Sequence, residues 1–228
     1  MEKAYYKAYD DRYRQVHGLD LQWFADAPTP IVGQIAEEFA LTAEHRMLEI
    51  GCGEGRDAVA MLRRGFDLAA TDVSPEAVAY CQARFSEFAD RFQVLDCLTE
   101  RADGSFDFIF AVAVLHMLVE DAHRDAFYRF FVAHLKTWGI GLICTMGDGA
   151  SEFSSDVRAA FDLQPRRHDA SGQTVHIAGT SCRVVRFSTF EAELHRNGLD
   201  VVRMGMTSAE PDFPQLMYAV VRVGGAER

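Results

Sequence analysis

The stretch Leu48-Glu49-Ile50-Gly51-Cys52-Gly53-Glu54-Gly55-Arg56-Asp57 decides the fold of this chain. An apolar strand ends around an acidic residue, three glycines follow at alternate positions, and a helix then runs to Gly65. Glycines let the chain turn sharply and let a ligand contact bare backbone, and we expect a side chain at Gly53 to fill space that the ligand needs. The amides that open the helix point into the same crevice. The stretch therefore predicts a ligand-binding turn between a strand and a helix.

A second apolar strand, Phe66 to Asp72, also ends in a carboxylate. An acidic residue at this position can accept hydrogen bonds from both ribose hydroxyls of a nucleoside. Ser74-Pro75-Glu76 follows at once and supplies an N-cap, a first-turn proline and an early acid for a helix. Strand, turn, helix, strand and helix in this order form a right-handed crossover unit. The two strands together predict a cofactor that contains a nucleoside.

The spacing of the glycines and the charge before them distinguish between cofactors. Dinucleotide-binding folds carry Gly-x-Gly-x-x-Gly, whereas this chain has Gly-x-Gly-x-Gly preceded by Glu49. A carboxylate there repels a diphosphate and suits a cationic ligand. S-adenosylmethionine carries a sulfonium and an ammonium group, so the sequence favours it over NAD. Two alternatives remain: an NAD-dependent oxidoreductase, which the lack of a Tyr-x-x-x-Lys pair disfavours, and a non-catalytic domain that binds S-adenosylmethionine.

In these motifs the chain resembles the class I S-adenosylmethionine-dependent methyltransferases, from about Glu44 to Met146 and more loosely to the C-terminus. The resemblance implies a Rossmann-like, doubly wound α/β sheet that is mostly parallel, has an antiparallel last strand and carries helices on both faces. The sequence Cys-Gly-Glu-Gly-Arg-Asp is also similar to tellurite-resistance-type and thiopurine methyltransferases. That narrower similarity implies a slight preference for a sulfur-type acceptor.

The resemblance also assigns roles to individual residues. The glycine turn would border the methionine part of the cofactor, Asp72 would bind the ribose, and Val73 would pack against the adenine. Asp96, at the end of a third predicted strand from Phe92 to Cys97, would meet the adenine amino group, and residues after the fourth strand would face the sulfonium. The predicted cofactor-binding residues are Glu49, Gly51, Cys52, Gly53, Asp72, Val73, Asp96, Cys97, Ala111, Val112 and Tyr13.

Aromatic residues are concentrated near the N-terminus, within residues 1–27. Tyr5, Tyr9 and Tyr13 are spaced by four and fit one face of a helix. Such a helix either packs on the domain or forms a lid whose rings attract the sulfonium by cation–π contact. A second irregular segment, residues 147–187, follows the fifth predicted strand at the edge where such sheets bind ligands. We expect residues 1–27 to be a lid and residues 147–187 a substrate-side cap on a single domain of 228 residues.

Further elements follow from the apolar pattern and its turn residues. The two closing strands are so closely joined that they must pair in antiparallel fashion. The predicted elements are a helix from Thr29 to Phe39, a fifth strand from Ile140 to Thr145 introduced by Trp138-Gly139, a helix from Thr189 to Asn197 capped by Ser188, and strands from Leu199 to Met204 and Gln215 to Val223, with a polar loop from Thr207 to Pro214.

Composition and charge narrow the functional class. The net charge of −11 argues against nucleic acid as a partner, because binding to phosphates needs basic residues. No apolar run approaches the roughly 20 residues that span a bilayer, so we expect no membrane segment. The five cysteines form no Cys-x-x-Cys pair, and we expect reduced thiols in a cytoplasmic protein. No dense cluster of histidines and carboxylates predicts a metal site.

Methyl transfer from a sulfonium is an in-line displacement, and a base is needed only for an acceptor that arrives protonated. His116, just beyond a fourth predicted strand from Phe106 to Phe110, is the candidate general base; its alternative role is to cap the following segment. The residues Ala111-Val112-Ala113-Val114 stand where DNA and protein-glutamine methyltransferases carry Asn/Asp-Pro-Pro-Tyr/Phe, which favours a small-molecule acceptor. Sulfur, oxygen and nitrogen acceptors remain open, as does the oligomeric state.

Overall fold

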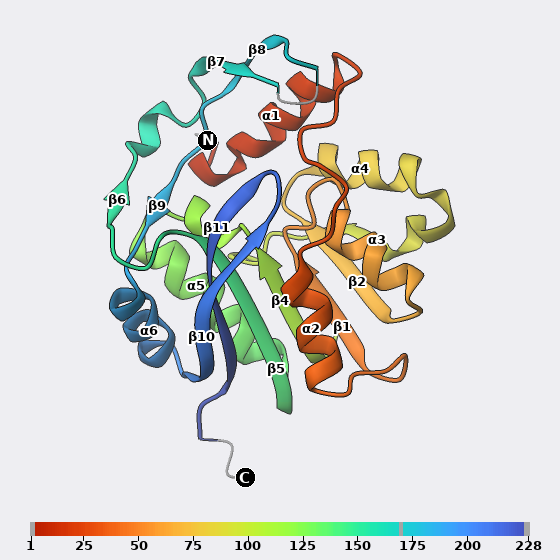
Figure 1. The fold of residues 1–228 in the computed structure, drawn as a ribbon, viewed down its shortest axis with the longest axis vertical. Coiled ribbons are helices and arrows are strands. Elements are labelled where there is room, and N and C mark those ends of the chain that lie inside the picture. The colour runs from red at the N-terminus through yellow and green to blue at the C-terminus, as the bar shows by residue number, and fades with distance from the viewer. Residues whose placement is uncertain (1–2, 169–170, 226–228) are drawn as a thin grey trace.

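The computed structural model describes residues 3–168 and 171–225, so residues 1–2 of the predicted lid and 169–170 of the predicted cap lie outside the described residues. Its centre is a seven-stranded sheet in the order β10-β11-β5-β4-β1-β2-β3 (Figure 1). The strands are β1 (Arg46–Ile50), β2 (Asp67–Asp72), β3 (Phe92–Val94), β4 (Phe106–Val112), β5 (Leu135–Met146), β10 (Leu199–Ala209) and β11 (Phe213–Val223). Neighbours from β3 to β5 are parallel, whereas β11 is antiparallel to both β5 and β10. The predicted fold class is confirmed.

Helices cover both faces of the sheet, and each face has its own apolar core. One core joins the sheet to α2, α3 and α4, and the other joins it to α5 and α6. Strand alternation divides β4 between them, because Phe110 and Val112 face the first core and Ala111 faces the second. The helices are α2 (Pro30–Glu38), α3 (Arg56–Arg63), α4 (Pro75–Arg84), α5 (Asp121–His134) and α6 (Phe187–Arg196), with short 3-10 helices η2 (Ser86–Arg91), η3 (Leu115–Met117) and η4 (Val157–Ala159).

The N-terminal segment and part of the predicted cap pack against each other above the carboxyl edge of the parallel strands (Figure 1). The N-terminal part is η1 (Tyr5–Lys7), α1 (Ala8–His17) and the chain up to Phe24; the cap part is the antiparallel pair β7 (Leu163–Arg167) and β8 (Thr174–Ala178). We call residues 3–24 and this hairpin together the roof. A second short pair, β6 (Phe153–Ser154) with β9 (Arg183–Val184), connects the hairpin to the sheet.

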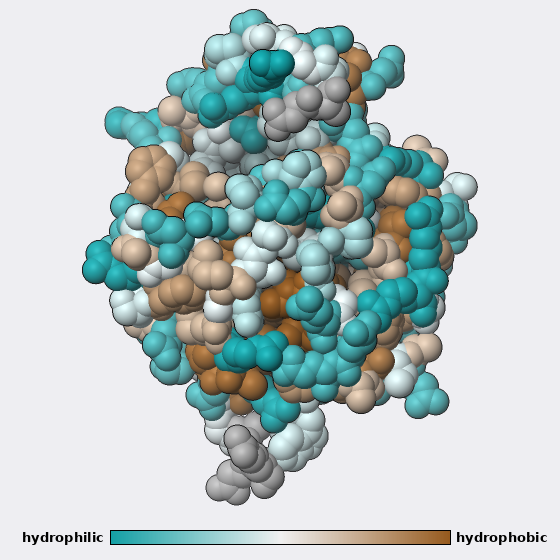
Figure 2. All heavy atoms as spheres, in the orientation of Figure 1, coloured by the Kyte–Doolittle hydropathy of each residue, from teal (hydrophilic) through white to brown (hydrophobic). Residues whose placement is uncertain are grey.

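The roof has a small apolar cluster between α1 and β8 and a hydrophilic outer surface. Val16 of α1 packs with Val175 and Ile177 of β8, and Leu21 and Trp23 border this small cluster. The guanidinium of Arg12 reinforces the contact by donating hydrogen bonds to the backbone oxygen of Ala178 (2.8 Å) and of Gly179 (3.0 Å) and to Thr180 Oγ1 (3.1 Å). Figure 2 shows a hydrophilic surface at the top of the molecule, where Figure 1 places β7 and β8; Arg166 and Arg167 of β7 and His176 of β8 are exposed.

Several predicted elements have different ends in the structure. Strand β5 begins at Leu135, so Trp138-Gly139 lies inside it, and the third strand stops at Val94 instead of Cys97. Helix α6 begins at Phe187 with Arg186 as its N-cap, so Ser188 lies within the helix. The predicted loop from Thr207 to Pro214 is mostly strand, because β10 and β11 continue to Ala209 and from Phe213. Cross-strand pairing extends these strands through polar residues that a hydrophobic pattern cannot identify.

Within the described ranges, no helix is both long enough and apolar enough to span a bilayer.

Candidate cofactor site

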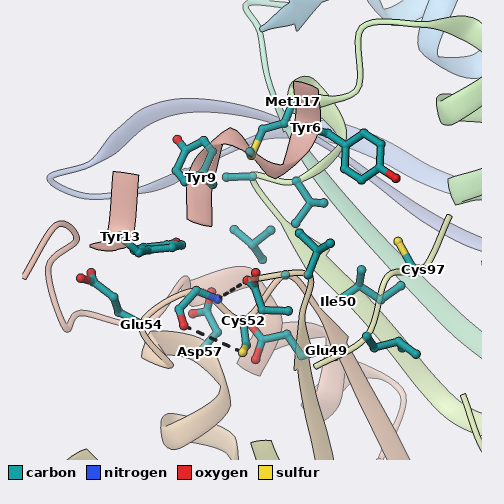
Figure 3. A pocket seen from close by; sticks show the side chains of 18 of the residues that line it. Tyr6, Tyr9, Tyr13, Glu49, Ile50, Cys52, Glu54, Asp57, Cys97 and Met117 are labelled. Atoms are coloured by element: carbon teal, nitrogen blue, oxygen red, sulfur yellow. Dashed lines mark hydrogen bonds between the residues drawn. The ribbon is translucent and has the colours of Figure 1, made fainter. Parts of the chain in front are cut away.

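A pocket lies between the carboxyl ends of β1, β2 and β4 and the roof (Figure 3). It encloses about 970 Å³, counting the part that is open to solvent. Tyr9, Tyr13 and Met117 lie on one side of it, and Glu49, Cys52 and Asp57 lie on the opposite side. The lining residues are Tyr6, Tyr9, Tyr13, Phe24, Glu49, Ile50, Gly51, Cys52, Gly53, Glu54, Arg56, Asp57, Asp72, Val73, Leu95, Asp96, Cys97, Leu98, Val112, Ala113, Val114, Met117, Leu118 and Phe213.

The glycine turn forms the floor of this pocket. The amides of Gly51 and Cys52 donate to the backbone oxygen of Thr71 (2.7 and 2.9 Å), which ties the turn to the end of β2. Gly53 has a positive φ of 53°, and a Cβ atom on it would lie 2.7 Å from the hydroxyl oxygen of Tyr13. The expectation that a side chain at Gly53 would fill space that the ligand needs stays a prediction; in this structure the hydroxyl of Tyr13, from the roof, borders that space.

Asp72 lies at the end of β2, where its buried carboxylate fixes the floor. It accepts hydrogen bonds from the amides of Gly53 (2.9 Å) and Ser74 (2.8 Å). Burial raises the pKa of Asp72 to about 6, although these amides oppose the shift. A carboxylate offers about four acceptor positions, so Asp72 retains capacity for further donors such as ribose hydroxyls.

Glu49 is a buried carboxylate with an unsatisfied atom. It is 2% exposed and lines the pocket, and its Oε2 has no hydrogen-bond partner among the described residues. Burial raises its pKa well above the ordinary value; the negative charge of Asp57 adds to this, whereas the positive charge of Arg56 opposes it. An unpaired buried carboxylate is costly, and a cation in the pocket would relieve that cost.

The roof supplies three tyrosines to the pocket, and they are not the three that the spacing predicted. Tyr9 and Tyr13 line it, but Tyr5 instead receives hydrogen bonds from the amides of Val119 and Glu120 (3.0 Å each). Tyr6 lines the pocket in its place, because residues 5–7 form a 3-10 helix rather than a turn of α-helix.

Asp96 connects the roof to the side wall of the pocket. Its Oδ2 accepts a hydrogen bond from the hydroxyl of Tyr6 (3.1 Å) and lies 2.8 Å from Lys7 Nζ, and its Oδ1 accepts from the amide of Leu98 (3.1 Å). Cys97 lines the same wall. The Asp96 carboxylate thus already binds the N-terminal end of the roof. The contact with adenine that the resemblance implies for Asp96 stays a prediction.

Two predicted site residues lie outside the pocket. Ala111 is fully buried in the core on the α5 side, because strand alternation points it away from Val112, which does line the pocket. His116 is 4% exposed and does not line the pocket, and its Nδ1 has no partner in the described structure. Burial lowers its pKa to about 3, helped by the charges of Arg124 and Arg12. His116 therefore lies outside the pocket lining, its role as a general base stays a prediction, and the turn η3 presents Met117 to the pocket.

Residues 47–139 match a family model described as a methyltransferase domain. The strand order, with an antiparallel strand inserted beside the fifth, agrees with that match. Over these residues the match supports the similarity to class I S-adenosylmethionine-dependent methyltransferases that the glycine turn indicates.

Individual relatives are distant. A ubiquinone biosynthesis O-methyltransferase of Xanthomonas campestris pv. campestris is 29% identical over 150 residues, 60% of this chain and 61% of that protein. A protein named hemagglutinin 1 from Eikenella corrodens is 27% identical over 142 residues, 61% of this chain and 44% of that protein. The matches thus span about half the length of these curated relatives.

Among solved structures, the fold is similar to a 1,6-didemethyltoxoflavin-N1-methyltransferase of Burkholderia thailandensis, described with its substrate and S-adenosylhomocysteine bound. The TM-score is 0.68 at 16% identity, and the match covers 98% of this chain and 92% of that chain. At this identity the likeness shows the fold alone.

The residues present fit an S-adenosylmethionine molecule. The unpaired carboxylate of Glu49 suits a ligand ammonium group, and Asp72 retains acceptor capacity for a ribose. The described part of the chain contains no group of three or more histidine, cysteine and acidic side chains arranged to hold a metal ion.

The sequence interpretation missed several lining residues for different reasons. Glu54 and Arg56 lie inside the glycine motif, and their charge is the sequence signal that points to them as lining residues. Met117 and Phe213 had no local signal, since a 3-10 turn directs the first and β11 brings the second from the far end of the chain.

Proposed function

We propose that this protein transfers the methyl group of S-adenosylmethionine to a small-molecule acceptor that is uncharged or cationic when it binds. The observation that carries the proposal is the charge of the pocket. Among the described residues, its lining includes five acidic side chains and one basic side chain, that of Arg56, and Lys7 pairs with one of the acids, Asp96; the acids are Glu49, Glu54, Asp57, Asp72 and Asp96.

This charge supports a cationic cofactor and disfavours an anionic acceptor. Arg56 is itself shared, because it lies 3.6 Å from Asp57 and 3.5 Å from Asp212. Charges interact more strongly in a buried pocket than in water, so an oxyanion or a thiolate would meet repulsion there. The sulfur-type acceptor implied by the narrower resemblance is therefore less favoured than a neutral nitrogen or oxygen nucleophile. The relatives named as an O- and an N1-methyltransferase agree with this preference.

Part of the pocket lining is aromatic and suited to an apolar or aromatic acceptor. This aromatic wall contains Tyr9, Phe24, Met117 and Phe213, and the rings of Phe24 and Phe213 lie 5.5 Å apart. Phe213 also borders a second, more open cavity, which offers an acceptor a route from solvent. The other residues of that cavity are Met146, Gly147, Asp148, Ser151, Val184, Asp212, Pro214 and Gln215.

In the proposed mechanism the chain acts by placement. When bound, the cofactor supplies an electrophilic methyl group on a sulfonium. Asp72 and Glu49 of the floor would hold the cofactor, and the aromatic wall would hold the acceptor against its methyl group. The roof excludes water. In the part of the chain that the structure describes, no histidine or lysine lines the pocket, so a neutral nitrogen acceptor would react as its free base, and the proton of a neutral oxygen acceptor would pass to one of the lining carboxylates. The five cysteines are free thiols, which supports our proposal of a cytoplasmic, reducing compartment.

A turnover assay with methyl-labelled S-adenosylmethionine tests this function. The panel contains neutral N-heterocycles, amines, phenols, thiols and chalcogen oxyanions, and the readout is release of S-adenosylhomocysteine. We expect turnover with nitrogen or oxygen acceptors of the first three classes. Turnover only with oxyanions or thiols would overturn the acceptor class, and a protein that binds no S-adenosylmethionine would overturn the activity itself.

A further inference from the structure

Glu54 is the point where the glycine turn meets the roof. It lies between Gly53 and Gly55 and is 3% exposed. Its Oε1 accepts a hydrogen bond from the amide of Trp23, and its Oε2 accepts one from the amide of Phe24 (2.7 Å each). One carboxylate of the floor thus fixes the segment that places Phe24 in the pocket.

The same carboxylate also contacts the C-terminal end of α1. His17, the last residue of α1, has its Nε2 3.0 Å from Glu54 Oε1 and its Nδ1 3.0 Å from Glu76 Oε1 in the first turn of α4. Both ring nitrogens can donate to these carboxylates only when the imidazole is protonated. The His17 side chain is 9% exposed, so water can replace few of these bonds.

The ring of His17 is connected to the pocket by the stacking of aromatic rings. It stacks between Tyr13 (centroids 5.6 Å apart) and Tyr80 (4.2 Å apart). Tyr13 lines the pocket and covers Gly53 with its hydroxyl. On the other side, the Tyr80 hydroxyl accepts a hydrogen bond from Arg84, which also pairs with Asp26. These groups, with Glu54 and Glu76, are the charged or titratable side chains around the imidazole.

We propose that Glu54, His17 and Glu76 form a latch that positions the roof over the cofactor. The latch loosens when His17 loses its proton. This inference rests on the proposed function, because it concerns the closing of the same pocket. His17 and Glu54 are positioning residues: they act through Tyr13 and Phe24.

The direction of the pH dependence follows from linkage. Hydrogen bonds to Glu54 and Glu76 raise the pKa of His17 above 6.5 in this closed arrangement and outweigh the effect of burial, which lowers it. If the roof opened, the pKa of His17 would return toward its ordinary value. Closure is therefore fully favoured below pH 6.5 and is weakened as the pH rises through the raised pKa. Because the latch positions Tyr13 and Phe24 in the pocket, affinity for the cofactor should fall over that range by up to about tenfold per pH unit.

Calorimetric titration of the full-length protein with S-adenosylhomocysteine, from pH 6 to 9, tests the latch. We expect the wild-type affinity to fall above pH 6.5. His17→Gln, which keeps a neutral donor but cannot titrate in this range, should bind more weakly at pH 6.5 and lose the alkaline fall. Glu76→Gln should shift the fall to lower pH, because it removes one of the charges that hold the proton; it also tests the latch if His17→Gln does not fold. His195→Gln, on an exposed face of α6, is the matched control and should keep the wild-type profile.

The outcomes separate the latch from the function. A wild-type affinity that does not change above pH 6.5, or an alkaline fall that persists unchanged in His17→Gln, would overturn the latch while leaving the cofactor site intact. Loss of the fall in His195→Gln would also overturn it, since the fall would then not report on His17. Absence of binding at every pH would overturn the proposed function, and the latch with it.

Discussion

The floor and the roof of the pocket are held by different kinds of contact. In the floor, the amides of residues 51–53 bond to Thr71 and Asp72 on the neighbouring strand of the sheet. In the roof, side chains from distant segments form the bonds: Tyr6 reaches Asp96, 90 residues away, and Arg12 reaches Ala178, 166 residues away. Backbone pairing inside a sheet opens only with the whole domain, whereas a few polar side-chain contacts can open locally. We therefore propose that the floor is a preformed surface and that the roof is the part that moves.

The largest expected effect comes from the point where floor and roof touch. Gly53→Ala places a Cβ at a positive φ of 53° and 2.7 Å from the Tyr13 hydroxyl, so we expect S-adenosylhomocysteine affinity to fall by at least about tenfold in calorimetry. Adding Tyr13→Phe should restore part of it, because the next atom of the ring is 3.7 Å away.

Gly65→Ala is the matched control for this substitution. Gly65 also has a positive φ, 86°, but nothing lies within 4 Å of its Cβ position and it is outside the pocket. It should cost stability without weakening the ligand affinity. If Tyr13→Phe restores nothing, the effect of Gly53→Ala belongs to the floor alone and the two regions are not coupled there.

A second prediction concerns the unpaired carboxylate of the floor. Glu49→Gln should weaken cofactor binding by about tenfold or more, since hydrogen bonds to charged groups contribute about 1.5–3 kcal/mol. The free energy of unfolding should stay equal or increase, because the buried, unpaired charge costs the fold. Calorimetry and urea unfolding measure the two quantities, with Glu191→Gln on exposed α6 as the control. A variant that loses stability but keeps its affinity for the cofactor would show that Glu49 stabilises the fold and does not bind the cofactor.

The third prediction is an acid limit to binding that is set by the floor. Burial raises the pKa of Asp72 to about 6 in the free protein, and donors from a ligand would favour its ionised form. Binding then releases a proton, so affinity should fall as the pH drops below about 6, by up to tenfold per unit. Asp72→Asn should bind the cofactor more weakly, and its affinity should depend less on pH. The pH dependence that remains would come from Glu49. An unchanged acid limit in Asp72→Asn would contradict the assignment.

The smallest effect is expected in the roof, away from the pocket. Arg12→Ala leaves the acceptors at residues 178–180 without their donor, which should lower the free energy of opening the roof by about 1–3 kcal/mol. Hydrogen exchange should become faster in α1 and β8 and stay unchanged in β1 and β4. Arg158→Ala, on a fully exposed arginine, is the control. Faster exchange in β1 as well would show that floor and roof open together.

The same division explains which parts of the site the sequence could predict. Glu49, Gly51, Gly53 and Asp72 were identified because a glycine turn between a strand and a helix is encoded within consecutive residues. Ala111 was misplaced by one residue, since which side of β4 faces the pocket depends on both cores. The tyrosines were expected as a helical stripe, and a single 3-10 turn exchanged Tyr5 for Tyr6.

The sequence by itself determined the sheet, the ligand-binding edge and the cationic character of the cofactor, because short-range backbone geometry and one acid before the glycines carry that information. Only the tertiary structure decided what closes the pocket. The contacts that close it come from segments that are distant in sequence: Tyr13 lies over Gly53, two carboxylates surround His17, and Phe213 lines the pocket. Their contacts depend on side-chain packing between those segments, and no local pattern records it.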